Sequence, residues 1–391
     1  MQEFKFIADM KAYLIEQSGG TSAAEPIQLK LSGVDLSSVN VYKLFAAVSE
    51  AGKYVAFDLS ACTGPTVWER YKDKGTDRVV SLALPDTVTE IAMDAFAATF
   101  ASLKTLKANG AETVGCYAFS RYRMLAEIDL PQATSVGDYA FSGCTALTKI
   151  KLPQVTSIGD GAFWGCTALD KIDLPQTTNV GDEAFWGCTA LDKIDLPQTT
   201  NVGDEAFCGC TALAKVTLPK ATNIGDKAFY NCTVLAEVDL PEATNVGDRA
   251  FCGCTALAKV TLPKATSIGD YAFSNCNKLA EVNLPEATNV GARAFCCCYA
   301  LAEINLPQAT NIGDQALACC HSLESLVLGT EPPTFGSEVF YDAGKDTESG
   351  FTIFVPDKAA KERLKAEINN PYSNWLAATG NAKFKGVEVR S

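Results

Sequence analysis

A repeat of 22 residues runs through most of this chain of 391 residues. The apolar stretch that begins at Leu147 begins again at Leu169 and recurs until Leu323. The register is clearest in one column of phenylalanines, spaced by 22 residues: Phe119, Phe141, Phe163, Phe185, Phe207, Phe229, Phe251, Phe273 and Phe295, followed by Leu317. A fixed period of this length predicts a solenoid, because each unit can bury its apolar side only against its neighbours.

The first part of each repeat has the pattern of a strand. Ile150 and Leu152 alternate with Lys149 and Lys151, which is typical of a strand with one buried and one exposed face. Pro153 has no N–H and ends this strand. The outward positions therefore form charged columns on one face of the predicted solenoid.

The second part of each repeat predicts a short extended segment and a corner. Residues 155–158 form the extended segment, and Gly159 permits a tight corner because it has no Cβ. The aspartate that follows, such as Asp160, precedes Ala-Phe, where a helical turn needs an N-cap. We interpret this Asp column as capping residues; a calcium ladder is disfavoured because the Gly-Gly-x-Gly-x-Asp repeat is absent.

The full pattern, Leu-x-x-Ile-x-Leu-Pro and then Val/Ile-Gly-x-x-Ala-Phe-x-x-Cys-x-x-Leu, resembles the BspA-like leucine-rich repeats of bacteria over roughly residues 79–328. The family's repeat is commonly one residue longer, a spacing that Phe96 and Phe119 still keep. The resemblance implies an α/β leucine-rich repeat solenoid. It would be right-handed and capped at both ends, with one parallel β-sheet on the strand face and short turns or helical turns on the other.

We expect three domains, which are the repeats and one segment on each side of them. Residues 1–78 are predicted to be an N-terminal cap with one atypical leucine-rich unit, containing helices at 3–17 and 41–51 and strands at 28–33 and 54–60. Residues 79–328 are the solenoid of about twelve repeats, each of 22 or 23 residues.

Residues 329–391 are predicted to be a C-terminal capping segment. It contains a strand at 351–356 and a helix at 358–368 with Asp357 as its N-cap. Tyr372, Trp375 and Leu376 are expected to cover the open end of the core.

Sixteen cysteines are present, and nine of them share one repeat position: Cys144, Cys166, Cys188, Cys210, Cys232, Cys254, Cys276, Cys298 and Cys320. We interpret this column as a buried, reduced ladder of small apolar side chains. Disulfides between coils are disfavoured because the side chains are parallel, and a metal array is disfavoured because zinc ligands must converge. So many free thiols favour a reducing or anaerobic setting.

Two surfaces are candidates for binding a partner. The first is the strand face, whose outward positions are Glu127, Lys149, Lys151, Lys171, Lys193, Lys215, Glu237, Lys259, Glu281 and Glu303. Charged columns can also serve only solubility and neighbouring-strand attraction. The second is a variable column of aromatic residues, Trp164, Trp186 and Tyr230, which either anchor a partner or are partly buried between coils.

Catalysis finds no support in the sequence. The single histidine, His321, lies in a repeat-like stretch and is interpreted as structural. No phosphate-binding or dinucleotide motif is present, so we expect no enzyme activity, no cofactor and no metal site. The net charge of −13 argues against nucleic acid as a partner, and no run of about 20 apolar residues predicts a membrane span.

The resemblance implies a bacterial cell-surface or secreted protein that binds other proteins, with extracellular-matrix and host-surface proteins as candidate partners. The first residues have no signal-peptide pattern, so the protein is intracellular or its signal is missing from this sequence; the resemblance favours the second. We expect a monomer. The alternatives are an intracellular or periplasmic structural scaffold without a host ligand, and a consensus-like repeat without any ligand.

Overall fold

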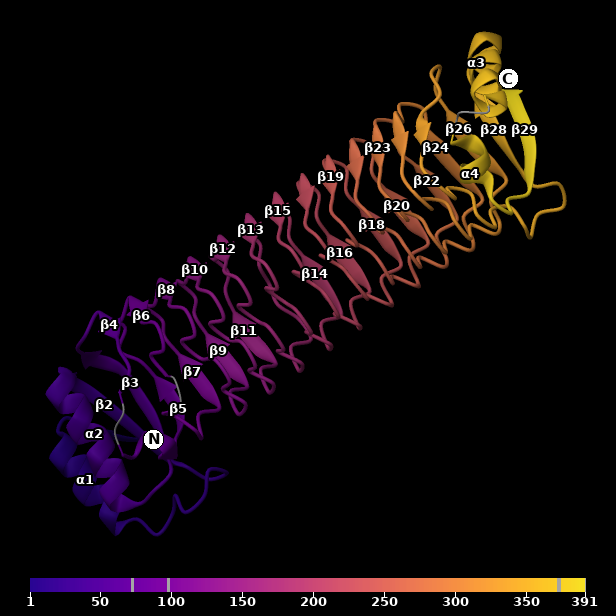
Figure 1. The fold of residues 1–391 in the computed structure, drawn as a ribbon. Helices are drawn as coiled ribbons and strands as arrows, with labels where there is room; N and C mark the ends of the chain where they lie inside the picture. Colours follow the sequence, from indigo (N-terminus) through magenta and orange to yellow (C-terminus); the bar gives the residue numbers. More distant parts are fainter. Residues whose placement is uncertain (72–73, 97–98, 371–373, 391) are drawn as a thin grey trace. The chain divides into compact units, whose positions relative to one another are not determined.

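The computed structural model describes residues 1–71, 74–96, 99–370 and 374–390. It divides into two compact units. Unit 1 comprises Met1–Thr177 and Ala184–Leu191, and unit 2 comprises Thr178–Glu183 and Asp192–Ser391. Each unit is a stack of coils in which every repeat contributes one strand to the strand face, or a short bridge at Asp173, and one to a second face (Figure 1).

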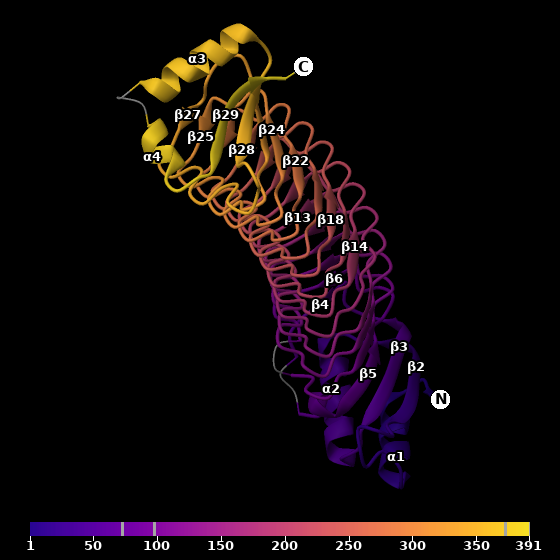
Figure 2. The same cartoon turned by 90° about the vertical axis from the view of Figure 1, so that its right-hand side faces the viewer.

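The strand face of unit 1 is a parallel sheet of seven strands, in the order β1-β2-β3-β5-β7-β9-β11. Its strands are β1 (Gln2–Phe4), β2 (Ile27–Asp35), β3 (Val55–Thr63), β5 (Val79–Ala83), β7 (Thr105–Lys107), β9 (Glu127–Asp129) and β11 (Lys149–Lys151). Helices α1 (Ile7–Glu16) and α2 (Ser38–Ala51) pack against each other at its start, and a short 3₁₀ helix, η1 (Thr76–Arg78), follows (Figure 2). The other predicted elements of the N-terminal segment are confirmed, but the helix predicted for 3–17 begins only at Ile7, because residues 2–4 form β1, which was not predicted.

The strand face of unit 2 is a parallel sheet of nine strands, β14-β16-β18-β20-β22-β24-β26-β28-β29. The strands are β14 (Lys193–Asp195), β16 (Lys215–Thr217), β18 (Glu237–Asp239), β20 (Lys259–Thr261), β22 (Glu281–Asn283), β24 (Glu303–Leu306), β26 (Ser325–Leu328), β28 (Phe351–Val355) and β29 (Phe384–Val389). The predicted strand near 351 is therefore confirmed, and β29 is an additional strand.

The prediction of a single parallel sheet is wrong, because the second extended segment of each repeat also pairs with its neighbours. In unit 1 these two-residue strands are β4 (Val67–Trp68), β6 (Glu90–Ile91), β8 (Thr113–Val114), β10 (Ser135–Val136) and β12 (Ser157–Ile158). In unit 2 they are β13 (Asn179–Val180), β15 (Asn201–Val202), β17 (Asn223–Ile224), β19 (Asn245–Val246), β21 (Ser267–Ile268), β23 (Asn289–Val290), β25 (Asn311–Ile312) and β27 (Thr334–Phe335). Each pairs in parallel with the same segment of the next coil, as Asn223 does with Asn245.

The core is filled by columns of identical side chains. The rings of Phe119 and Phe141 in unit 1 are 5.3 Å apart and within 4° of parallel, and those of Phe251 and Phe273 in unit 2 have the same geometry. The ladder cysteines lie beside this stack and are fully buried. Ladder thiols donate to the carbonyl of the phenylalanine one coil back, as Cys232 Sγ does to Phe207 at 3.2 Å.

The Asp column does not cap its own turn, which corrects the sequence interpretation. The residue after each such Asp has a positive φ, for example 53° at Lys227, so the chain turns sharply and forms no helix there. The carboxylate instead accepts from the next coil, and the Asp248 N–H donates to Asp226 Oδ1 at 2.7 Å. The preceding glycine makes this possible, because a Cβ on Gly247 would lie 2.6 Å from that same oxygen.

The C-terminal segment contains α3 (Lys358–Asn369) and α4 (Trp375–Thr379). Asp357 caps α3, since the Ala360 N–H donates to its Oδ1 at 2.7 Å, which confirms the predicted helix and its cap. Trp375 is buried, with ring centroids 5.4 Å from Phe335 and 5.2 Å from Phe384. Tyr372 and the side chain of Leu376, also expected here, lie outside the described residues.

The Asp ladder predicts opposite effects for two exchanges. Asp226→Ala removes the acceptor for the Asp248 N–H, so we expect a loss of about 1 kcal/mol in the free energy of unfolding. Ala292 stands in the same column, and Ala292→Asp would supply an acceptor to the next coil, so it should stabilise by about 0.5 kcal/mol. Urea unfolding of both variants tests this; equal effects of the two exchanges would contradict it.

The buried thiols predict a loss of stability at alkaline pH. Burial raises the pKa of Cys144 and of Cys188 to about 12 and raises the pKa of the other buried thiols Cys166, Cys232 and Cys276. Unfolded thiols ionise near pH 8.5, so their contribution is complete below that pH and is lost as pH rises toward the folded pKa.

Each such thiol should lower the free energy of unfolding by about 1.4 kcal/mol per pH unit in that window. The measurement is the urea midpoint from pH 7 to 10 under reductant. Cys232→Ala serves as the matched control, because it removes one titrating thiol and should make the decline shallower. A midpoint that does not change with pH would refute the expectation.

Candidate functional site

The first candidate surface is the strand face with its predicted charged columns. Nine of the ten predicted side chains are exposed and Glu303 is half-buried. The inward residues between them are buried, as Ile150 is. Within each unit the parallel register places equivalent residues side by side, for example Lys149 beside Glu127 and Lys215 beside Glu237.

Part of this charge is neutralised within the face. Lys149 Nζ lies 3.3 Å from Glu127 Oε1, and Lys151 Nζ lies 3.1 Å from Asp129 Oδ2. In unit 2, Arg390, which directly follows β29, pairs with Glu303 at 3.1 Å. Exposed ion pairs contribute little to stability, so their main effect is to fix the pattern of charge that a partner would meet.

Two steps of the strand face carry like charges instead. Lys193 lies beside Lys215, and Glu281 lies beside Glu303. Like charges on neighbouring strands are destabilising; the ion pair with Arg390 offsets the glutamate step, whereas the lysine step is not explained by stability. A hollow of about 400 Å³ is lined by residues of β20 and β22, which include Lys259 and Glu281.

The second candidate surface is aromatic. The indole rings of Trp164 and Trp186 stack with centroids 4.9 Å apart and planes within 6°. Trp164 is 37% exposed and Trp186 is half-buried. The two rings are thus partly buried against each other and partly exposed, and the role as a partner anchor stays a prediction. Tyr230, in unit 2, is half-buried.

A second aromatic column lies beside the first, and the sequence analysis missed it. Tyr117 and Tyr139 stack with centroids 5.3 Å apart, and Tyr117 is 43% exposed. The Tyr139 ring lies over Gly161, where a Cβ would be 2.2 Å from its Cε1. Gly161 in turn accepts a hydrogen bond from the Trp164 N–H at 2.9 Å. We call Tyr117, Tyr139, Trp164 and Trp186 the aromatic surface.

A hollow of about 620 Å³ continues from the aromatic surface at Tyr117. Arg121 and Arg123 supply cations to its lining, and Met124, which is 50% exposed, supplies apolar surface. Asp94 adds one anion. Aromatic rings, guanidinium groups and a flexible thioether around one concavity are the groups that contribute most to protein interfaces.

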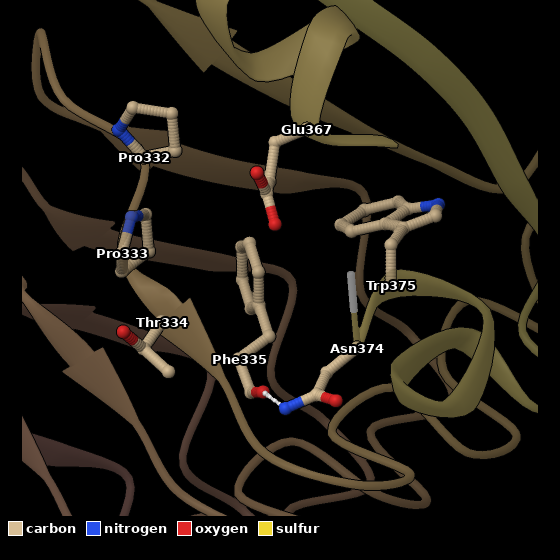
Figure 3. Close-up of a pocket in the computed structure, with 7 residues that line it drawn as sticks. All are labelled: Pro332, Pro333, Thr334, Phe335, Glu367, Asn374 and Trp375. Atoms are coloured by element: carbon tan, nitrogen blue, oxygen red, sulfur yellow. Dashed lines mark hydrogen bonds between the residues drawn. The ribbon is translucent and has the colours of Figure 1, made fainter. Parts of the chain in front are cut away.

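A third concavity lies in the C-terminal segment of unit 2 and measures about 300 Å³ (Figure 3). The Asn374 side chain donates to the Phe335 carbonyl at 3.2 Å at its base. Glu367 from α3 points toward the same space, and Pro332 and Pro333 form the opposite wall. The asparagine is already engaged by the backbone, and Glu367 and Thr334 supply further polar groups to the lining.

One cluster of metal-ligand types occurs in unit 2, although the sequence analysis expected none. Cys319, His321 and Asp342 each offer one ligand atom, and these atoms lie within 4.8 Å of one another. All three side chains are half-buried. His321 Nδ1 also lies 3.6 Å from Asp346 Oδ2, and its ring is 5.0 Å from Tyr299.

Stacked parallel coils, exposed columns and shallow concavities define a leucine-rich repeat solenoid. The family model for the "BspA type Leucine rich repeat region (6 copies)" matches residues 74–154, 134–258 and 222–345. These spans cover more than half of the chain, so the chain belongs to the BspA-type leucine-rich repeat family. Solenoids of this class are in general non-catalytic scaffolds for protein interactions. Among the described residues, no helix is long and apolar enough to cross a bilayer.

Several solved structures are similar to this chain. A leucine rich cell surface protein from Faecalibacterium prausnitzii A2-165 is 23% identical, over 62% of this chain and 83% of that one, with a TM-score of 0.35. A leucine-rich repeat protein of T. pallidum is 25% identical, over 63% and 88%, with a TM-score of 0.34. A leucine-rich repeat protein from Bacteroides ovatus ATCC 8483 is 20% identical, over 82% and 90%, with a TM-score of 0.36. A comparison with curated proteins gives no match.

The like-charge step on the strand face predicts a stabilising substitution. Lys193→Glu would place a carboxylate beside Lys215, so we expect the free energy of unfolding to rise by about 0.3 kcal/mol at low salt. Urea unfolding at low and high salt measures it, and the gain should shrink with salt. Lys149→Glu is the matched control, because it breaks the pair with Glu127 and should destabilise. A destabilising Lys193→Glu would count against this account of the strand face.

Proposed function

We propose that this protein is a non-catalytic protein-binding and adhesion module, borne on the surface of a bacterium or secreted, that contacts proteins of a host or of another cell. Extracellular-matrix and host-surface proteins are the candidate partners. Membership of the BspA-type family supports the surface location, as does the similarity to a structure described as a cell surface protein. The proposal includes a monomeric, right-handed solenoid, capped at both ends, with domains at 1–78, 79–328 and 329–391.

The observation that carries the proposal is the aromatic surface of unit 1. Tyrosine, tryptophan and arginine are the residues that most often supply binding energy at interfaces. Here the rings stack on each other, which restricts their motion before a partner arrives and lowers the entropy lost on binding. The adjoining hollow adds Arg121 and Arg123, which can pair with carboxylates of a protein partner.

The strand face has a secondary role in this proposal. Its exposed charges attract and orient a partner, because electrostatic complementarity acts mainly on association rate and specificity. The like-charged step at Lys193 and Lys215 is retained although it opposes stability, whereas Arg390 neutralises Glu303 at the Glu281–Glu303 step. An acidic group of a partner would relieve the lysine step.

The proposal predicts saturable binding to immobilised matrix proteins or mucins that survives physiological salt. In the aromatic variant, Tyr117→Asn is combined with Trp164→Ser. Asparagine tolerates the positive φ of 56° at Tyr117, and serine already occupies the Trp164 column at Ser142. We expect at least tenfold weaker binding, because the exposed rings are the proposed anchors.

Tyr230→Ser is the matched control, since it makes the same kind of change in the same column outside the aromatic surface. It should bind like the parent protein. Lys193→Glu should slow association and change its salt dependence. Equal loss in the aromatic variant and the control would remove the aromatic surface from the proposal. Absence of binding to every matrix protein and mucin would favour the scaffold without a host ligand.

A further inference from the structure

The inference begins with a backbone position that repeats in the described coils from Arg121 to Asp342. The residue two positions after the core phenylalanine, or its replacement Leu317, has a positive φ there. After Arg121 in the first of these coils, the corner is occupied by Gly143, Gly165, Gly187, Gly209 and Gly253, with Asn231 and Asn275 at two further coils. Glycine and asparagine are the residues that adopt this conformation at least cost.

The last coils depart from this rule. The corners there are Cys297, Cys319 and Asp342, with φ of 62°, 59° and 56°. Aspartate tolerates a left-handed backbone, but cysteine is not among the residues that adopt it readily, and the strain is of order 1 kcal/mol per residue. Two successive coils therefore carry a thiol where the rest of the repeat shows that glycine suffices.

The next departure lies beside these corners. Two positions further on, the repeat carries threonine at Thr145, Thr167, Thr189, Thr211, Thr233 and Thr255, whereas this coil carries the only histidine of the chain, His321. The structure brings these exceptions together: ligand atoms of Cys319, His321 and Asp342 lie within 4.8 Å of one another. Cys297 occupies the same corner one coil earlier, beside Cys319, and its Sγ lies 3.6 Å from that of Cys296.

The surroundings hold these groups in place. The Cys297 N–H donates to the Ala318 carbonyl at 2.9 Å, and the Cys319 N–H donates to the Tyr341 carbonyl at 2.7 Å, so the corners are stacked by the backbone. Asp346 lies 3.6 Å from His321 Nδ1, and its N–H donates to the His321 carbonyl at 3.1 Å. A carboxylate on one ring nitrogen is the usual partner of a histidine whose other nitrogen binds a metal.

We propose that Cys297, Cys319, His321 and Asp342 bind one Zn²⁺ ion. Two sulfurs, one imidazole nitrogen and one carboxylate oxygen form a set that zinc accepts in tetrahedral geometry, with bonds of about 2.0–2.3 Å. The ligand atoms of Cys319, His321 and Asp342, which lie within 4.8 Å of one another, can reach the roughly 3.5 Å separations of such a site by side-chain rotation, and Cys297 at the neighbouring corner supplies the fourth ligand. Binding exchanges the two thiol protons for two Zn–S bonds and releases both protons to solvent.

The test uses the whole untagged chain, stripped of metal and kept reduced with a phosphine that does not bind zinc. Zn²⁺ is titrated against a chromophoric chelator, and Co²⁺ is added as a spectroscopic probe. We expect one equivalent to bind. The cobalt form should show thiolate charge-transfer bands and the intense visible bands of tetrahedral Co²⁺, which Zn²⁺ displaces.

Three variants give the assignment its specificity. Cys319→Gly and His321→Thr restore the residues that other repeats carry, so the fold should be retained, and each should weaken Zn²⁺ binding at least tenfold. Cys252→Ser is the control: it removes a half-buried thiol outside the ligand set and installs the serine found at Ser274. Its zinc affinity should equal that of the parent, with near-ultraviolet circular dichroism checking the fold of all three.

Several results would overturn the proposal. A cobalt form without thiolate bands would do so, as would zinc affinity that survives both Cys319→Gly and His321→Thr. Loss of affinity in the Cys252→Ser control would assign the binding to thiols in general. A Cys297–Cys319 disulfide formed in air, with no metal bound under reductant, would make this pair a redox site instead. None of these outcomes bears on adhesion, which depends on other residues.

Discussion

Within each unit, the described repeats place each residue on its own equivalent in the next coil, at the spacing of paired strands, about 4.8 Å. Such a column is favourable only for side chains that pack or hydrogen-bond well against identical side chains. Phenylalanine rings stack on one another, and the ring centroids of Phe229 and its successors are 5.1 to 5.3 Å apart. Asparagine amides bond to asparagine amides, as Asn223 does to Asn201 at 2.9 Å. The residue types of the repeat therefore depend on how well identical side chains stack, as much as on the fold of one unit.

The same constraint shows where function can reside. Columns that stack well, such as the phenylalanines and the ladder cysteines, have little freedom to change. The places where stacking is unfavourable or strained are therefore informative. Lys193 beside Lys215 is one such place, and the cysteines at the left-handed corners are another. At neither place do the neighbouring groups described above offset the energetic cost, which is charge repulsion at the lysines and backbone strain at the cysteines.

The sequence was sufficient for the period, the strands and the buried columns, because these depend on spacing alone. Ile150 between Lys149 and Lys151 already specifies which side is buried. The sequence was insufficient, however, to predict the interactions between coils. The bond from the Asp248 N–H to Asp226 joins residues 22 apart, so a local capping rule pointed to the wrong donor. The second sheet escaped prediction for a related reason: a strand of two residues has no periodicity to detect.

The cluster at Cys319, His321 and Asp342 shows what a repeat-based analysis can overlook. Each residue alone is unremarkable in a chain with sixteen cysteines and many carboxylates. Aligning the coils reveals that these residues replace glycine, threonine and glycine or asparagine at adjacent columns. The relevant signal is therefore the coincidence of departures from the repeat, which spacing motifs for zinc cannot find because the ligands come from successive coils.

The sixteen cysteines consequently form more than one population, and this bears on where the protein can work. The ladder thiols are buried, and Cys232 Sγ donates to a backbone carbonyl 3.2 Å away, with its pKa raised by burial. Thiols of this kind are poor nucleophiles and stay reduced because oxidants and partners cannot reach them. A high cysteine count therefore does not by itself require a reducing compartment. The redox setting matters for the half-buried corner thiols, which a bound metal would hold as thiolates and protect from oxidation.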